Sequence, residues 1–291
     1  MKQAQLRDIL TLSRPHFLVG GALAYALGAS TAGTVAVDRY LLGQVMVTAA
    51  QLTAHFLNEY ADRFVDAGIT NRTVFSGGSG VLLTGRVDPR LALRFGQVAT
   101  IVALVASLAV GTYSSVAAAL GLGALGISWA YSMPPIRLLG TGWGEAATTA
   151  VVIGAVPLIG SASQGSPPSS TLWISIAVLF PVHFATMLVF EIPDIESDGA
   201  AGKWVLSVRI GRRATEVLIS CAFLTGVAVL AAGALLGSLS RVAMLAAIAI
   251  GPGWLTLRAV SSDRYGPATV SAVGTLVIAI VGLGLGALLA G

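Results

Sequence analysis

The sequence predicts an all-α membrane protein with nine transmembrane helices in one bundle. Of its 291 residues, 55% are hydrophobic and only 10% are charged, whereas about a quarter of the residues of a soluble domain are charged. The apolar stretches lie at 17–36, 41–60, 91–112, 114–131, 145–163, 171–191, 214–236, 241–260 and 268–290. Each is about long enough to cross a bilayer as a helix. The fourth and fifth are rich in Gly and Ala, which favours close helix packing. We expect one polytopic membrane domain over residues 1–291.

The charged residues gather on one side of these nine predicted spans. That side holds all 17 Lys and Arg residues except Arg39 and Arg241, and all 13 Asp and Glu residues except Asp38. Because basic loops mark the cytoplasmic side, we predict a multi-pass protein of the cell membrane with its N-terminus inside and its C-terminus outside. The rule concerns bases, so the acids gathered there indicate a working face on the cytoplasmic side.

Composition also bears on partners. The pI of about 9.6 suits anionic lipid head groups or an anionic substrate. Basic and aromatic residues do not alternate as they do in nucleic-acid-binding segments, so no nucleic-acid partner is expected. The sequence indicates no protein partner.

Two short acidic runs each end a long apolar stretch. Their triplets are Asn58, Asp62 and Asp66, at i, i+4 and i+8, and Glu191, Asp194 and Asp198, at i, i+3 and i+7. On a helix each triplet would lie along one face, where like charges repel and require a cation. Oxygen ligands favour Mg²⁺, which prefers a few carboxylates together with phosphate oxygens. We therefore predict that these six residues hold Mg²⁺ against a diphosphate.

The pattern of apolar stretch, acidic run and polar loop occurs twice. The long polar loop after Asp66 is matched by the polar segment from Gly199 to Arg213. This predicts a pseudo-repeat of roughly 1–130 and 131–260, and sites in such proteins lie where the halves meet.

Further motifs accompany the two runs. In chain order they are Arg14-Pro15, Asn71-Arg72-Thr73, Ser76-Gly77-Gly78-Ser79-Gly80, Tyr131-Ser132-Met133-Pro134-Pro135-Ile136-Arg137, Gly142-Trp143-Gly144-Glu145 and Gly202-Lys203-Trp204-Val205-Leu206-Ser207-Val208-Arg209-Ile210-Gly211. With the acidic runs, over nearly the whole chain, they resemble the UbiA superfamily of intramembrane aromatic prenyltransferases. The glycine segment and the run around Asp194 are most similar to the branch that prenylates 1,4-dihydroxy-2-naphthoate for menaquinone. Two positions depart from that branch, which often has Asn at Glu191 and a basic-Thr pair at Trp204-Val205.

The resemblance implies a Mg²⁺-dependent transfer from a polyprenyl diphosphate to an aromatic acceptor. Asp62, Asp66, Asp194 and Asp198 would be the catalytic carboxylates. The metal would neutralise charge on the leaving diphosphate, and a dry cavity would protect the allylic cation. The residues placed to bind substrate are Asn58, Arg72, Lys203, Arg137, Tyr131, Arg14 and His55.

Several of these residues have a second interpretation. His55 lies one turn before Asn58, and either contacts the acceptor or acts as a base, or is simply hydrogen-bonded inside the bundle. Tyr131 and Arg137 either close an acceptor pocket or anchor the membrane interface. The Gly77-Gly78 loop is either a lid over the site or a plain turn.

Two other functions compete with the transferase. A UbiA-type membrane terpene cyclase would share the metal site but use no aromatic acceptor. An ion-coupled transporter would also carry acids in its membrane helices. Transport sites usually lie near the midplane at broken helices, whereas these acids lie at the predicted cytoplasmic ends, which argues against transport.

Overall fold

The computed structural model describes residues 3–69 and 71–289, and over these residues every regular element is a helix. The longer helices are α1 (Gln3–Leu12), α2 (Pro15–Ser30), α3 (Val37–Asp62), α4 (Pro89–Gly111), α5 (Ser115–Ser132), α8 (Ser170–Glu191), α11 (Arg212–Leu235), α12 (Ile250–Ser261) and α13 (Tyr265–Leu288). The shorter ones are α6 (Gly144–Thr149), α7 (Val156–Ser163), α9 (Ile195–Ala200) and α10 (Leu206–Ile210). Tighter turns are η1 (Asp66–Gly68), η2 (Leu82–Thr84), η3 (Leu138–Gly140), η5 (Ile192–Asp194) and η6 (Val242–Ala249), and η4 (Ala150–Ala155) is a π-helix.

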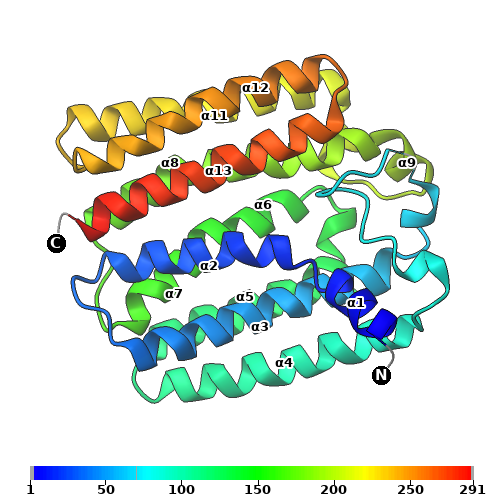
Figure 1. Cartoon of the computed structure of the whole chain (residues 1–291), viewed down its shortest axis with the longest axis horizontal. Helices are drawn as coiled ribbons and strands as arrows, with labels where there is room; N and C mark the ends of the chain where they lie inside the picture. The colour runs from blue at the N-terminus through cyan, green and yellow to red at the C-terminus, as the bar shows by residue number, and fades with distance from the viewer. Residues whose placement is uncertain (1–2, 70, 290–291) are drawn as a thin grey trace.

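The long helices lie side by side along one axis (Figure 1). α3 packs against α4 and α5, and α8 packs against α11 and α13. α2 contacts α7, α3 and α13, so it joins the two groups of helices. The predicted apolar stretches coincide with these helices to within a few residues at most ends. The all-helical fold class is therefore confirmed.

Within the described part of the chain, seven helices are long and apolar enough to cross a membrane, which makes the protein a multi-pass membrane protein. They are Pro89–Gly111, Ser115–Ser132, Gly144–Ser163, Ser170–Ala200, Arg212–Leu235, Val242–Ser261 and Tyr265–Leu288. The two remaining predicted spans correspond to α2, which has only 16 residues, and α3, which has 26 residues but carries many polar side chains. The count of nine spans and the direction of the termini stay predictions.

Small residues bring α2 and α7 into backbone contact. A Cβ atom on Gly28 would lie 1.8 Å from the Pro157 carbonyl oxygen, and one on Gly160 would lie 2.3 Å from the Tyr25 carbonyl oxygen. The close packing expected for the Gly- and Ala-rich stretch 145–163 is thus present. Just before this contact the helix widens into η4, and Pro157, which lacks an N–H, explains part of that irregularity.

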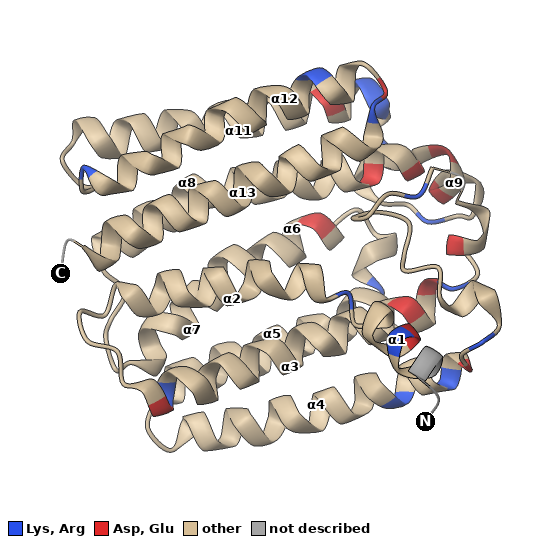
Figure 2. Cartoon of the chain, in the orientation of Figure 1, with Lys and Arg blue, Asp and Glu red and all other residues tan. Residues whose placement is uncertain are grey.

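The polar connections gather at one end of the bundle. α1, α9 and the long loop between α3 and α4 lie together there (Figure 1), and most charged residues colour the same end (Figure 2). The opposite end carries Asp38 and Arg39 at the start of α3, and Arg241 before η6. The structure thus has the charge asymmetry that the sequence predicts.

Candidate active site

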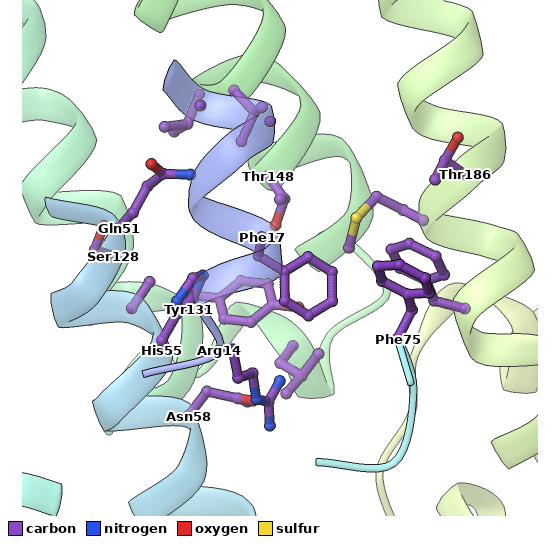
Figure 3. A pocket seen from close by; sticks show the side chains of 18 of the residues that line it. Arg14, Phe17, Gln51, His55, Asn58, Phe75, Ser128, Tyr131, Thr148 and Thr186 are labelled. Atoms are coloured by element: carbon purple, nitrogen blue, oxygen red, sulfur yellow. The ribbon is translucent and has the colours of Figure 1, made fainter. Parts of the chain in front are cut away.

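A cavity of about 450 Å³ lies within the bundle and reaches its polar end. Its wall is formed by α2, α3, α5, α6, α8 and α13 together with the loop after η1. Figure 3 shows the side chains that line it, from Gln51 and Thr186 to Arg14 and Asn58. Most of the wall is apolar, and the carboxylates of both acidic runs lie on it. The cavity therefore joins a charged end to an apolar interior.

The helix that carries the first acidic run ends in the middle of the run. α3 ends at Asp62, and Asp66 lies in the separate turn η1, so the prediction of one continuous helical face is wrong here. The Arg63 guanidinium donates to the Tyr60 carbonyl oxygen, the acceptor that the Phe64 amide would need for the helix to continue. Asp66 nevertheless reaches the cavity wall and is buried.

The second run is interrupted in the same way. α8 ends at Glu191, the turn η5 contains Pro193, and α9 carries Asp198. A single α-helical face is again the wrong description, because Pro193 cannot donate a backbone hydrogen bond. Asp194 and Asp198 are buried and both line the cavity. The turn η5 therefore still brings Asp194 and Asp198 to the cavity wall, although the two residues do not share one α-helical face.

Lys203 connects the two runs. Its Nζ lies 3.7 Å from Asp62 Oδ2 and 3.3 Å from Asp198 Oδ2, and its side chain is only 14% exposed. Burial lowers the pKa of Lys203, but Asp62 and Asp198 raise it by more, so the net shift is upward and the ammonium stays charged. Asp62 also contacts Arg137, whose Nη2 lies 3.3 Å from Oδ1, and accepts a 2.9 Å hydrogen bond from Asn58 Nδ2.

The carboxylates retain capacity for a cation. The Oδ1 atoms of Asp194 and Asp198 are buried and have no hydrogen-bond partner among the described residues. Burial raises the pKa of Asp66 to about 6, and the Asp62 carboxylate adds to the rise. Within residues 3–69 and 71–289 no three His, Cys, Asp or Glu side chains form a ready-made metal cage. Mg²⁺ usually completes its shell with water and substrate phosphate rather than with protein ligands alone.

Glu191 is held differently from the four aspartates. It lines the cavity, but its Oε2 accepts a hydrogen bond from the Ser207 amide at 3.4 Å. The neighbouring Glu145 accepts one from the Leu206 amide at 2.9 Å. These two glutamates fix the start of α10, and with it the segment that follows Lys203. Glu145 begins α6, a position that the sequence explains without any role in the site.

Glu59 holds the first polar loop, and the sequence analysis missed it. Its carboxylate pairs with Arg14, whose Nε lies 2.7 Å away. It also accepts from the backbone amide of Ser79 at 2.8 Å and from the Ser79 hydroxyl at 2.6 Å. A charged residue in the last turns of an apolar helix, three positions before Asp62, was the available signal. Arg14 itself lines the cavity, as predicted for a substrate-binding residue.

The glycine loop covers the carboxylates. Gly77 and Gly78 line the cavity and have φ of 81° and 73°, which L side chains rarely adopt. A Cβ on Gly78 would lie 2.0 Å from Asp66 Oδ2. The backbone of the loop at Gly78 is therefore packed directly against the Asp66 carboxylate. Arg72 braces this loop by donating to the Asp66 carbonyl oxygen at 2.9 Å, and it lines a neighbouring hollow instead of the cavity itself.

The remaining predicted residues lie where a substrate would be. His55 and Tyr131 both line the cavity, and His55 Nδ1 lies 2.8 Å from the Ser13 carbonyl oxygen. This hydrogen bond is the structural role considered for His55, and it leaves the other ring nitrogen available. The sequence did not single out the aromatic rings of Phe17, Phe75 and Phe190, which contact one another beside these residues.

The fold and the site together define a membrane-embedded enzyme of the prenyltransferase class, and comparison with known proteins agrees. The model of the UbiA prenyltransferase family matches residues 17–279. The chain belongs to the UbiA prenyltransferase family. No curated protein sequence matches it.

Solved structures share the fold at low identity. A UbiA homologue from Archaeoglobus fulgidus bound to DMAPP and Mg²⁺ has a TM-score of 0.68 at 17% identity, covering 94% of this chain and 98% of that one. The apo UbiA homologue from Aeropyrum pernix K1 gives 0.72 at 14% identity, covering 95% and 98%. A digeranylgeranylglyceryl phosphate synthase gives 0.64 at 17% identity, covering 98% and 99%. The likeness therefore extends over the whole fold.

Proposed function

We propose that this enzyme transfers a polyprenyl group from a polyprenyl diphosphate to an aromatic acceptor, with Mg²⁺ as its cofactor. One observation carries the proposal. Carboxylates from two distant parts of the chain meet on one wall of an otherwise apolar cavity, and the basic Lys203 lies between them. Such a site suits a ligand that has an anionic head and a long apolar tail. Homologues of the same fold bind DMAPP or GPP together with Mg²⁺.

The metal would be held by Asn58, Asp62 and Asp66 on one side and by Asp194 and Asp198 on the other. The unpartnered oxygens of the last two residues are part of this fit. Glu191, the sixth residue of the predicted set, also lines the cavity, although the Ser207 amide already occupies one of its oxygens. Bound there, Mg²⁺ supplies Lewis-acid neutralisation of the leaving diphosphate.

The protein's own residues would bind the diphosphate and exclude water from the reaction. Lys203, Arg137 and Arg14 would offer positive charge to the diphosphate oxygens. Lys203 contacts Asp198, Arg137 contacts Asp62, and Arg14, which lines the cavity, pairs with Glu59 on α3. The C–O bond of the donor breaks with its electron pair leaving on the diphosphate, and the allylic carbon is left cationic. The apolar wall keeps water away from that carbon until the acceptor ring attacks it. The ring then loses a proton and becomes aromatic again.

For the acceptor we propose 1,4-dihydroxy-2-naphthoate, and hence a step of menaquinone synthesis. The support is the likeness of the segment Ser76–Leu82 and of the run around Asp194 to that branch of the family. His55 and Tyr131 would contact the acceptor, since both lie on the cavity wall next to Asn58. With the basic loops predicted to be cytoplasmic, the site would open to the cytoplasmic side of the cell membrane.

The test is a transfer assay on membranes that contain the enzyme. Labelled polyprenyl diphosphate and Mg²⁺ are supplied with or without 1,4-dihydroxy-2-naphthoate. We expect a prenylated naphthoate only when the acceptor is present. Release of diphosphate with a cyclic hydrocarbon and no acceptor would instead identify a membrane terpene cyclase. Absence of turnover in both mixtures would contradict the proposed acceptor.

A further inference from the structure

The cavity has two chemically different walls. On one side, α3 and α5 present Gln51, His55, Ser128 and Tyr131 (Figure 3). All four side chains carry a polar group, and they extend from the level of Asn58 into the apolar interior. Polar groups are costly there unless they are hydrogen-bonded, so any of the four that lacks a partner within the protein is a candidate for contact with a ligand.

The facing wall carries aromatic rings, and its polar side chains are hydrogen-bonded within the protein; His183 Nδ1, for example, lies 2.9 Å from Thr149 Oγ1. Phe75 from the first loop and Phe190 from α8 stack with their ring centroids 5.7 Å apart and their planes 6° apart. Thr186 on α8 is polar, but its hydroxyl donates to the Val182 carbonyl oxygen at 2.9 Å. This side suits an isoprenoid chain, which brings no hydrogen-bonding group of its own.

Among these four residues, Gln51 carries a buried side-chain atom that has no partner in the described part of the chain. Its Oε1 is buried and has no hydrogen-bond partner among the described residues. By contrast, Ser128 already donates to the Ala124 carbonyl oxygen at 2.9 Å. A buried amide oxygen without a partner is unfavourable, and a bound ligand that donates a hydrogen bond would satisfy it.

The packing around Gln51 makes room for its amide. On α2, Gly21 faces it, and a Cβ atom there would lie 2.3 Å from Gln51 Oε1 and 2.4 Å from Nε2. Gln51 also lies on the same face of α3 as Asn58, seven residues earlier, which is about 10 Å along a helix. An acceptor bound on this wall would therefore lie between Asn58, in the proposed metal site, and the Gln51 amide.

We propose that Gln51 Oε1 accepts a hydrogen bond from a hydroxyl group of the aromatic acceptor, and that the α3–α5 wall is the acceptor side of the cavity. The isoprenoid chain of the donor then lies along the aromatic wall of Phe75 and Phe190. This assignment rests on the proposed function and deepens it. It places the acceptor ring between Gln51 and Asn58, with the face of the ring toward the cationic carbon of the donor.

The experiment measures binding separately from turnover. The Gln51→Leu protein is titrated with 1,4-dihydroxy-2-naphthoate in detergent, under nitrogen and without donor, by isothermal titration calorimetry. We expect the acceptor Kd to rise about tenfold, while the Kd for geranyl diphosphate with Mg²⁺ stays unchanged. The thermal unfolding midpoint should not fall, because the amide oxygen that is removed has no partner to lose.

Two further variants make the result specific. Gly21→Ala should weaken acceptor binding in the same direction, because its methyl group would displace the Gln51 amide while leaving it in the protein. Thr186→Val on the opposite wall should leave the acceptor Kd unchanged. An unchanged acceptor Kd in Gln51→Leu, or weakened donor binding in that variant, overturns the assignment. Absence of naphthoate binding to the wild-type protein overturns it as well. Failure of the proposed function appears separately, as acceptor binding without prenyl transfer.

Discussion

The Glu59 carboxylate accepts two hydrogen bonds from Ser79, one from the backbone amide at 2.8 Å and one from the hydroxyl at 2.6 Å. Through this contact α3 holds the glycine loop, because Ser79 directly follows Gly77 and Gly78. The same carboxylate pairs with Arg14 before α2. One buried side chain therefore sets the position of a loop and of a basic residue on the cavity wall.

Replacing this glutamate tests that arrangement. Glu59→Gln keeps the size of the side chain but removes its charge, so Arg14 loses its partner and the loop is held less firmly. Breaking such a buried pair costs about 3–5 kcal/mol, and we expect a clear fall in the unfolding midpoint together with reduced turnover. Circular-dichroism melting in detergent and the transfer assay measure the two effects. Glu196→Gln, at an exposed position, is the matched control, and an equal effect in both variants would contradict the role of Glu59.

The catalytic carboxylates should be separable from folding. Asp62→Asn and Asp194→Asn should each abolish transfer, because each removes a negative charge that would hold the metal. Both proteins should still be recovered from the membrane fraction, since the bundle packs through its apolar faces. Asp38→Asn, at the opposite end of the bundle, should keep full activity. Transfer that survives both site replacements would refute the metal site proposed here.

The glycine loop offers a steric test. Gly78→Ala places a methyl group 2.0 Å from Asp66 Oδ2, so the carboxylate or the loop must move, and we expect turnover to fall at least tenfold. Gly85→Ala is the control, because Gly85 has a similar φ of 68° and no atom near its Cβ. Both variants carry the backbone strain, but only the first reaches the site. Similar activity in the two proteins would show that strain, and not contact with Asp66, is responsible.

Lys203 should matter for donor binding. In Lys203→Met the Asp62 and Asp198 carboxylates lose their shared cation, and the diphosphate loses a basic partner. We expect the Kd for geranyl diphosphate, measured with Mg²⁺ by calorimetry, to rise more than tenfold. Arg213→Met, in a basic residue at the start of α11, should leave that Kd unchanged. Donor binding of wild-type strength in Lys203→Met would place the diphosphate elsewhere.

Removal of metal gives a test without mutation. EDTA should stop transfer and added Mg²⁺ should restore it, because few protein ligands are available to retain the ion. Far-UV circular dichroism should not change on chelation, since the helices pack without the metal. Transfer that continues in EDTA would argue against Mg²⁺ as the cofactor.

Much of the fold could be read from the sequence, because a membrane helix leaves an unbroken apolar stretch. Two features could not be read. The helix-face model failed beyond Asp62 because the Arg63 side chain takes the carbonyl oxygen that the next helical turn needs. Arg72 was placed by its distance along the chain, yet it braces the loop, because a long polar segment can turn back on itself in ways that spacing does not reveal.

The candidate site likewise contains some residues that the sequence reveals and others that it does not. Residues with unusual chemistry in an apolar context, such as the aspartates and Lys203, stand out in the sequence. Gln51, Gly21 and Phe190 do not, because an amide, a glycine and an aromatic ring are common in membrane helices. Their importance depends on what they face across the cavity, and only the three-dimensional arrangement shows that. The pseudo-repeat of the two halves stays a prediction.

The position of Lys203 has a consequence for the enzyme at rest. Its ammonium lies between Asp62 from the first half of the chain and Asp198 from the second. It therefore neutralises negative charge from both acidic runs before any donor binds. Assembly of the site need not await magnesium, because residues of the protein itself already form this charge pattern.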